Sequence, residues 1–323
     1  MQQEIFDLLN KLGYETYFAG DEDKKKPKEV INADIIISLP KSINKLYKSK
    51  GRKFVFTCNT HIVIKNRKLV ESSKKWKLPC EYYPSINDNL KSYYNADYLL
   101  IAENDEGINN YLSQGIDPDK IIRYNNCIDH DIWIPNSKNQ KFIFIMWASY
   151  IGLRKGLPAL VEAWKKWFTN QNAALYIIGM PTVTSDIIFN NKRQGEVFPG
   201  LFLDLDIHPA QDPRKIEFIG SASVGVLPTL EDAQPSSLLE MASCGLPIIT
   251  TVESGVEFED TFCKYIDTDN STEIVDALQY WYEKKGSIIK YGEIAREFIL
   301  RNHTWESLHF RFSEILSNNN YKG

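Results

Sequence analysis

The sequence lacks the features that mark several classes of protein. Its five cysteines are odd in number and show no close spacing of metal ligands, which favours buried thiols in a reducing compartment. No apolar run approaches the ~18 residues of a membrane span and no signal peptide opens the chain, so we expect a cytoplasmic protein. A net charge of −4 provides no overall basic field, so nucleic acid is not an expected partner.

The composition is that of an ordinary globular protein with an α/β pattern. The 323 residues are 43% hydrophobic, and this length favours two domains because single cores stop growing near ~250–300 residues. Short apolar runs bounded by turn residues predict parallel strands covered on both faces. These runs are 15–20, 32–40, 52–60, 96–103, 117–126, 141–148, 173–179, 200–207, 222–228, 246–251 and 264–267.

Helical patterns separate most of these strands and close the chain. They are found at 4–14, 42–50, 105–114, 157–168, 236–243, 272–285, 292–302 and 304–318. The polar stretch 134–141 is the best linker, and it divides the pattern into two consecutive series. Two such series predict two Rossmann-like, doubly wound lobes with a ligand site in the cleft between them. Segment 62–83 has no clean period, and we expect a long loop or hairpin beside the cleft.

The stretch EDAQPSSLLEMASCGLP, which begins at Glu231, turns from a predicted strand into a helix. The helix N-terminus offers unpaired N–H groups and a positive dipole end to a phosphate, and Ser236 and Ser237 either cap the helix or contact phosphate oxygens. Asp232 precedes the helix and Glu240 lies within it, so both can accept hydrogen bonds from hydroxyls flanking an anion. A nucleotide sugar has this layout. The alternative is a structural N-cap and a dipole-stabilising glutamate.

This stretch resembles the signature of retaining glycosyltransferases with the two-lobed GT-B fold, in the large family four (glycosyl transferases group 1). The resemblance implies that Glu240 binds the donor ribose. It also implies that Asp232, with Glu231 beside it, contacts the transferred sugar as a catalytic residue.

Other segments carry the same resemblance. ASYIGLRKGLPALVEAW is similar to the opening of the family's second lobe, which implies that Lys155 binds the donor diphosphate and stabilises its developing charge. The family's arginine falls on Tyr150 here, and Arg154 is the candidate substitute. In TCNTH, His61 follows a strand at the cleft edge, near the sugar and acceptor by resemblance, although a lone histidine is also common in loops and cores.

The resemblance also implies a division of the chain. Residues 1–136 form the acceptor-side lobe, 137–300 the nucleotide-sugar-binding lobe and 301–323 a helix crossing back, in which Trp305 packs. The strand and glycine-rich loop that open the family's first lobe have no counterpart in the sequence, so another segment covers that edge, or the acceptor site is built differently, or activity is reduced.

The expected reaction is transfer of a hexosyl group from a UDP- or GDP-sugar to a glycan or lipid-linked hydroxyl, with retention. We expect no metal, because Lys155 and the helix end supply positive charge, and we interpret Asp204-Leu205-Asp206 as strand-end residues. The alternatives are a non-catalytic sugar-nucleotide-binding or partner-binding GT-B protein and a nucleotide-sugar epimerase.

One basic stretch follows the predicted strand 32–40, and a second follows His61. A solvated surface is the simpler interpretation of each, and peripheral contact with an anionic membrane or lipid-linked phosphate is the alternative. The second stretch is KNRKLVESSKKWK, and the residues of the first are Lys45, Lys48, Lys50, Arg52 and Lys53.

Overall fold

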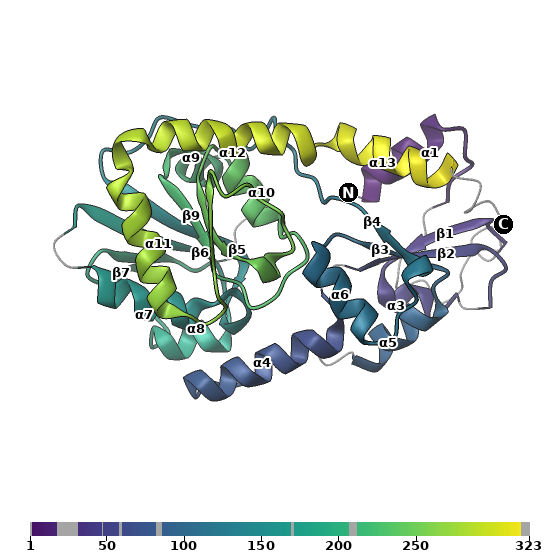
Figure 1. Cartoon of the computed structure of the whole chain (residues 1–323), viewed down its shortest axis with the longest axis horizontal. Coiled ribbons are helices and arrows are strands. Elements are labelled where there is room, and N and C mark those ends of the chain that lie inside the picture. Colours follow the sequence, from purple (N-terminus) through teal and green to yellow (C-terminus); the bar gives the residue numbers. More distant parts are fainter. Residues whose placement is uncertain are drawn as a thin grey trace.

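A computed structural model describes residues 2–17, 32–46, 48–57, 60–81, 86–168, 171–206 and 212–317. Its strands form two sheets, one of four strands in the order β1-β2-β3-β4 and one of seven in the order β11-β10-β9-β5-β6-β8-β7. The two sheets lie toward opposite ends of the long axis of the molecule, each covered by helices (Figure 1). We call the four-stranded sheet with its helices the first lobe and the seven-stranded sheet with its helices the second lobe.

The first lobe is built on parallel strands with apolar residues on both faces. One face packs under α1 and α13 (Trp305–Ser317) through residues that include Leu8, Phe56 and Phe312. The other face packs under α3, α5 and α6 through residues that include Leu99 and Tyr111. The elements are α1 (Gln2–Lys11), β1 (Ile35–Ser38), α3 (Pro40–Ile43), β2 (Arg52–Thr57), α5 (Ile86–Asn95), β3 (Tyr98–Ile101), α6 (Asp105–Ser113), η1 (Pro118–Lys120) and β4 (Ile121–Arg123).

The second lobe contains six parallel strands and one antiparallel edge strand, β7. The chain runs outward from β5 to β6 and β8 and then returns to β9 on the other side of β5, so the strand order reverses between β5 and β9. Ligands of doubly wound sheets bind beyond the carboxyl ends of the strands at such a reversal. The strands are β5 (Phe142–Ile151), β6 (Ala173–Pro181), β7 (Gln194–Phe198), β8 (Leu201–Asp204), β9 (Val224–Leu227), β10 (Ile248–Thr251) and β11 (Cys263–Ile266).

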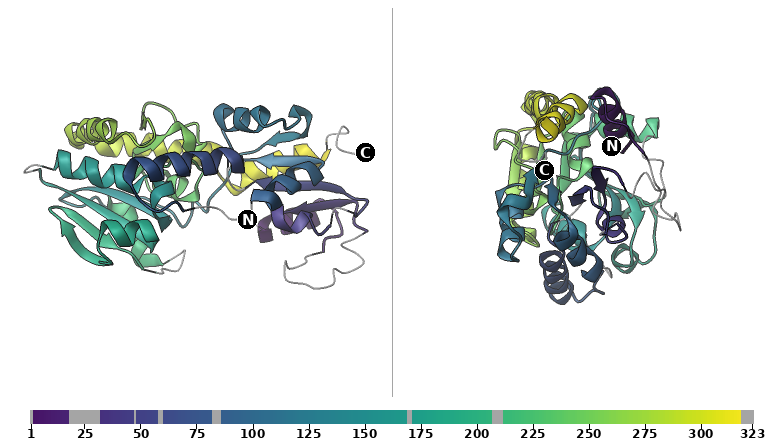
Figure 2. Two further views of the ribbon diagram at one scale, coloured as in Figure 1. Left: turned by 90° about the horizontal axis from the view of Figure 1, so that it is seen from below. Right: turned by 90° about the vertical axis from the view of Figure 1, so that its right-hand side faces the viewer.

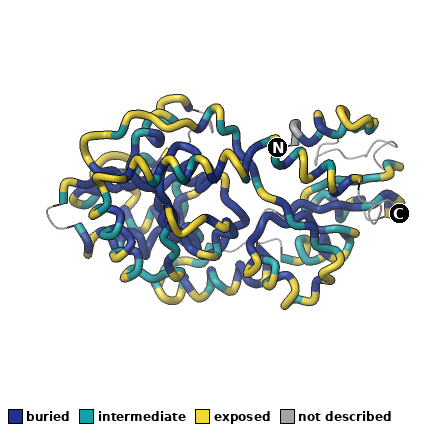
Figure 3. Tube along the Cα trace, turned by 45° about the horizontal axis from the view of Figure 1, so that its top comes forward, coloured by how far each residue is buried: buried dark blue, intermediate teal, exposed yellow. Residues whose placement is uncertain are grey.

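Helices cover both faces of the second sheet, and the last two run back toward the first lobe (Figures 1 and 2). Trp305, at the start of α13, packs against the first-lobe core. Figure 3 shows buried chain running through the interior of each lobe, with exposed chain mostly toward the outside. The helices are α7 (Leu157–Trp167), α8 (Val183–Ile188), α9 (Pro213–Ser221), α10 (Ser236–Ser243), α11 (Ser271–Glu283), α12 (Ile288–Asn302) and α13 (Trp305–Ser317).

Three expectations about secondary structure were wrong or fall partly outside the described chain. The helix expected over 42–50 is limited to α3, which ends at Ile43 and is followed by turns. Residues 14–17 form no strand, and the rest of the predicted strand 15–20 lies outside the described residues. The loop expected over 62–83 is instead mostly a helix, α4 (Ile62–Trp76). None of the helices in the described ranges combines the length and apolar character that crossing a membrane requires.

Candidate functional site

The carboxyl ends of β5 and β9 bring four predicted site residues together. Arg154 and Lys155 lie in the short helix η2 (Leu153–Lys155) after β5, and Glu231 and Asp232 lie in the loop after β9. The Lys155 Nζ contacts Asp232 Oδ2, and the Arg154 Nη1 lies 3.1 Å from Asp232 Oδ1 and 3.5 Å from Glu231 Oε1. We call these four residues the charge cluster.

The charge cluster is held together by a close approach of two backbone segments. Gly156 has a φ of 73°, and a Cβ at this position would lie 1.9 Å from the Pro228 carbonyl oxygen. Only glycine therefore allows η2 to lie this close to the loop after β9. The Leu230 N–H donates to the Arg154 carbonyl at 2.8 Å, which fixes the two segments in register.

Electrostatics keeps the buried carboxylate of Asp232 ionised. Burial alone would raise the pKa of Asp232, but Arg154 and Lys155 lower it to about 2. Asp232 and Lys155 are each only 5% exposed, so their attraction is weakly screened by water. The charge cluster therefore places buried charged groups of both signs side by side beyond the ends of β5 and β9.

The first lobe contributes a further cation to this region through α4. Lys65 is fully buried, and its Nζ lies 3.1 Å from Glu231 Oε1. Lys68, one turn later, lies 3.1 Å from Glu253 Oε1, and Leu69 packs against apolar side chains of the second lobe. Figures 1 and 2 show α4 running from the first lobe alongside the second.

The buried face of α4 explains why the sequence did not reveal this helix. Its buried residues follow helical spacing, but half of them are polar. A search for apolar periodicity therefore misses a face that packs against charges. The membrane alternative for this basic stretch was also wrong for Lys65 and Lys68, because both pair with acids of the second lobe. The buried positions of α4 are Ile62, Ile64, Lys65, Asn66, Leu69 and Ser72.

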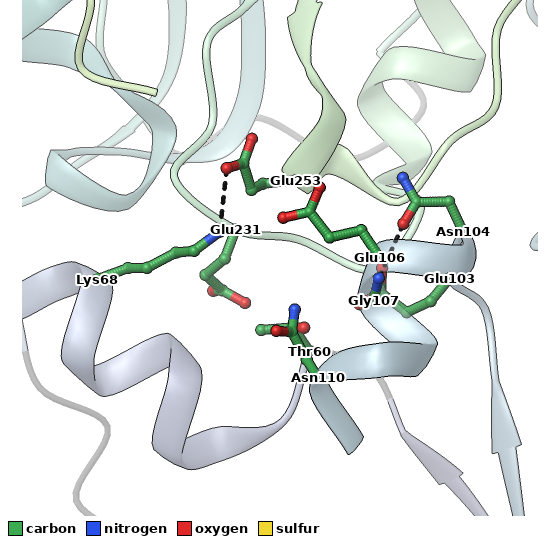
Figure 4. Close-up of a pocket in the computed structure, with 9 residues that line it drawn as sticks. All are labelled: Thr60, Lys68, Glu103, Asn104, Glu106, Gly107, Asn110, Glu231 and Glu253. Atoms are coloured by element: carbon green, nitrogen blue, oxygen red, sulfur yellow. Dashed lines mark hydrogen bonds and ion pairs between the residues drawn. The ribbon is translucent and has the colours of Figure 1, made fainter. Parts of the chain in front are cut away.

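A small pocket beside the charge cluster is lined by residues of both lobes (Figure 4). Glu103, directly after β3, is 1% exposed, and its Oε1 makes no hydrogen bond within the described residues. Burial, together with Glu231 and Asp232, raises the pKa of Glu103 well above its ordinary value. A Cβ on Gly107 or Gly255 would lie 2.3 Å from Glu103 Oε2, so these glycines make room for the carboxyl group.

Glu103 and Lys65 were not among the residues predicted from the sequence. Glu103 ends a predicted strand, and an acidic residue at that place was the only signal. The signal for Lys65 was its basic surroundings, which indicated a surface. Pairing across two lobes is a property of the folded chain that neither local pattern contains.

The remaining donor-site candidates do not join the charge cluster. The Trp147 Nε1 donates to Glu240 Oε2 at 2.6 Å, and burial raises the pKa of Glu240 to about 7. Ser236 is exposed and Ser237 is buried at the start of α10, where no side chain caps the helix within the described residues. Within the described residues, no hydrogen bond or ion pair links Glu240, Ser236 or Ser237 to the charge cluster.

His61 lies at the N-cap of α4, inside the first lobe. It is 1% exposed, and its ring centroid lies 5.1 Å from that of Tyr93 and 5.3 Å from that of Tyr111. Burial lowers the pKa of His61 to about 4, so its imidazole is neutral at pH 7.

The first basic stretch divides between surface and interior. Lys45, Lys48 and Lys50 are exposed. Lys53 is 8% exposed and its Nζ donates to the Gly51 carbonyl at 3.0 Å, so neither the solvated surface nor the alternative of membrane contact fits Lys53.

Among the residues that the structure describes, the aspartates considered as a nominal metal motif are not clustered with further ligands. Asp204, at the end of β8, pairs with Lys215. The described residues contain no group of three or more His, Cys, Asp or Glu side chains arranged to hold a metal ion.

Comparison with known proteins places this geometry in context. Residues 141–284 match the family model described as Glycosyl transferases group 1. Among solved structures, sucrose-phosphate synthase from Thermosynechococcus elongatus is similar with a TM-score of 0.71 and 13% identity, covering 90% of this chain and 74% of that one. No curated protein matches the chain in sequence.

Two further solved structures share the fold. HepE of Anabaena, in complex with UDP and glucose, has a TM-score of 0.65 and 10% identity, covering 88% of this chain and 78% of that one. WaaG, a glycosyltransferase involved in lipopolysaccharide biosynthesis, has a TM-score of 0.60 and 16% identity, covering 85% and 80%. The fold is therefore α/β and GT-B, as the sequence predicted.

Proposed function

We propose that this chain, whose second lobe belongs to the glycosyl transferases group 1, is a retaining glycosyltransferase. It moves a hexosyl group from a UDP- or GDP-sugar to the hydroxyl of a glycan or lipid-linked acceptor. In this proposal residues 1–136 bind the acceptor, residues 137–300 bind the donor, and residues 301–323 cross back to the first lobe. The reaction takes place in the cytoplasm.

The observation that carries this proposal is the position of the charge cluster. It lies beyond the carboxyl ends of β5 and β9, where the strand order of the second sheet reverses and where doubly wound folds bind their ligands. Breaking the bond between an anomeric carbon and a diphosphate develops negative charge on the leaving oxygen. Fixed cations such as Lys155 and Arg154 stabilise that charge without reorganising during the reaction.

In this proposal the carboxylates bind the parts of the donor that carry hydroxyl groups. In this proposal Asp232, with Glu231 beside it, contacts the transferred sugar, and Glu240 accepts hydrogen bonds from the ribose. Ser236 and Ser237, at the uncapped start of α10, offer hydrogen bonds to the phosphate oxygens.

His61 completes the proposed site from the first lobe. A neutral imidazole can donate one hydrogen bond and accept another, which suits contact with the hydroxyls of a sugar or an acceptor. The leaving phosphate removes the acceptor proton in this mechanism, and the reaction needs no metal ion.

A donor-turnover experiment tests the proposal. Purified protein is incubated with UDP- and GDP-sugars, and release of UDP or GDP is measured. We expect slow release by wild type that is lost in Lys155→Ala and Glu240→Ala and kept in Glu314→Gln, an exposed control on α13. Proton NMR of the first-formed sugar should show the anomeric configuration of the donor.

Two other results would replace the proposal. Binding of a nucleotide sugar without turnover, whichever sugar acceptor is added, indicates a non-catalytic binding protein. Conversion of the donor into an epimeric nucleotide sugar indicates an epimerase.

A further inference from the structure

The pocket of Figure 4 lies where the two lobes meet, and both lobes supply its walls. Thr60, Glu103 and Asn110 are among its residues from the first lobe, and Glu231 and Glu253 come from the second. Its volume is about 10 Å³, which is room for one group of the size of a water molecule. We call it the interlobe pocket.

Contacts between the lobes hold the walls of the interlobe pocket in place. The Lys68 Nζ lies 3.1 Å from Glu253 Oε1, and the Asn104 Nδ2 donates to the Val252 carbonyl at 2.8 Å. These contacts join α4 and the start of α6 to the segment that follows β10. The two sides of the pocket are therefore fixed to one another before any ligand enters.

Two buried carboxylate oxygens that line this pocket have no hydrogen-bond partner. Glu103 and Glu231, one from each lobe, are each 1% exposed. Thr60 hydrogen-bonds the Glu103 carboxyl group, and Lys65 pairs with Glu231 Oε1. Within the described residues, however, Glu103 Oε1 and Glu231 Oε2 accept no hydrogen bond. Because a buried acceptor without a donor is costly, a pocket lined by two such atoms calls for a group that donates hydrogen bonds.

The position of the Glu103 carboxyl group is set by backbone from both lobes. A Cβ on Gly107, in α6, or on Gly255, in the second lobe, would lie 2.3 Å from Glu103 Oε2. The carboxyl group therefore lies directly against both backbone segments, which limits where its unpartnered oxygen can turn.

The size and the hydrogen-bonding pattern of the interlobe pocket select a hydroxyl group. A hydroxyl is as large as a water molecule and carries a hydrogen that a carboxylate oxygen can accept. A phosphate group is larger than this pocket, and its ionised oxygens only accept hydrogen bonds. Glu231 also belongs to the charge cluster, where it is the neighbour of Asp232. The pocket thus lies beside the place proposed for the transferred sugar.

We propose that the interlobe pocket binds one hydroxyl group of the transferred sugar, and that Glu103 is the first-lobe residue that recognises this hydroxyl. The inference rests on the proposed function, because that function places the sugar beside Glu231. A sugar with hydrogen in place of this hydroxyl leaves the carboxylate oxygens without a donor. Glu103 therefore contributes to the choice of the sugar that is transferred.

Single-deoxy analogues of the donor test this inference. The nucleotide sugar that wild type hydrolyses is compared with analogues in which each sugar hydroxyl in turn is replaced by hydrogen, and kcat/KM for nucleotide release is measured. In wild type we expect one of these replacements to lower kcat/KM at least ~10-fold. The same replacement should cost at least ~5-fold less in Glu103→Ala, and every other replacement should cost the same within about twofold.

Two further variants separate recognition of a hydroxyl from a structural role. Glu103→Asp keeps the carboxyl group but shortens the side chain by one methylene group, so it should lose the same discrimination, and it covers a failure of Glu103→Ala to fold. Asp105→Asn, an exposed change at the start of α6 and outside the lining of the pocket, is the matched control and should discriminate as wild type does. The dissociation constants of UDP and GDP, which contain no hexose, should stay within about threefold of wild type in all three variants.

The outcomes separate this inference from the proposed function. If wild type hydrolyses no nucleotide sugar, the proposed function is wrong and the inference falls with it. If wild type is active and both Glu103 variants keep its discrimination at every position, only the inference is overturned, and the pocket holds an ordered water molecule.

Two other results also overturn the inference alone. An equal loss of kcat/KM for the donor and all of its analogues means that Glu103 is merely structural. A loss of discrimination among added sugar acceptors, with unchanged hydrolysis of every donor, places the recognised hydroxyl on the acceptor instead of the transferred sugar.

Discussion

Replacing Glu240 by glutamine should change how the stability of the protein depends on pH. Burial raises the pKa of Glu240 from its ordinary 4.5 to about 7 in the folded chain, with the Trp147 Nε1 donating to its carboxylate at 2.6 Å. Between these two pH values the native state binds a proton that the unfolded chain has lost. The native state therefore loses stability as pH rises through this window, and the loss is complete above about pH 7.

The size of the effect follows from the same pKa values. Each unit of pKa is worth about 1.4 kcal/mol, so the difference between 4.5 and about 7 corresponds to about 3 kcal/mol. Glu240→Gln keeps an oxygen that can accept from Trp147 but does not titrate. Relative to wild type, the variant should gain stability by up to about 3 kcal/mol as pH rises from ~4.5 to above ~7.

Urea unfolding followed by tryptophan fluorescence at pH 5, 6, 7 and 8 measures this difference. Glu314→Gln, an exposed substitution on α13, should differ from wild type by less than about 1 kcal/mol and equally at every pH. A constant difference between Glu240→Gln and wild type at all four pH values would refute the reasoning, because it would mean that Glu240 titrates alike in both states.

Further predictions concern the charge cluster, the contact between the lobes and the first-lobe histidine. Lys155→Met should weaken binding of UDP or GDP at least ~10-fold by calorimetry, because it removes a fixed cation from the diphosphate. Leu69→Ala should lower the free energy of unfolding in urea by about 2–5 kcal/mol, because this fully buried side chain packs α4 against the second lobe. Gly156→Ala should lower the melting temperature, since φ is 73° there and the new Cβ would lie 1.9 Å from a carbonyl oxygen. His61 has a pKa of about 4, so the pH profile of donor turnover should be the same in wild type and His61→Gln between pH 5 and 8, whatever the change in rate.

Most of the architecture follows from local pattern, because parallel strands covered on both faces need continuous apolar runs. Runs such as 142–147 and 248–251 can satisfy this only as interior strands, and both are strands of the second sheet. The close packing of Arg154, Lys155, Glu231 and Asp232 then depends on sheet topology, since each pair lies in the segment that follows one of two adjacent strands. Local spacing and sheet topology suffice for these features.

Contacts between the lobes could not be predicted in the same way. Lys65 and Lys68 look like surface residues in a one-dimensional sequence, because their partners lie more than 160 positions away, at Glu231 and Glu253. The surroundings of Glu103 likewise include Gly255 of the other lobe, which lies against the Glu103 carboxyl group in the folded chain. The physical cause is the same in each case: charge and burial at these sites are set by the docking of two lobes, which no local period encodes.

The proposed function also gives a reason for the two carboxylates that lie beside the cations of the charge cluster. Ion pairs removed from water seldom stabilise a fold more than apolar packing would, so five charged side chains at the meeting of the lobes, counting Lys65, are poorly explained by stability. In the proposed function, Glu231 and Asp232 hold the cations in place before the donor binds. Under that proposal a diphosphate competes for those cations, and each carboxylate that it displaces accepts hydrogen bonds from the sugar next to it. The same residues then position the donor at both ends of the bond to be broken.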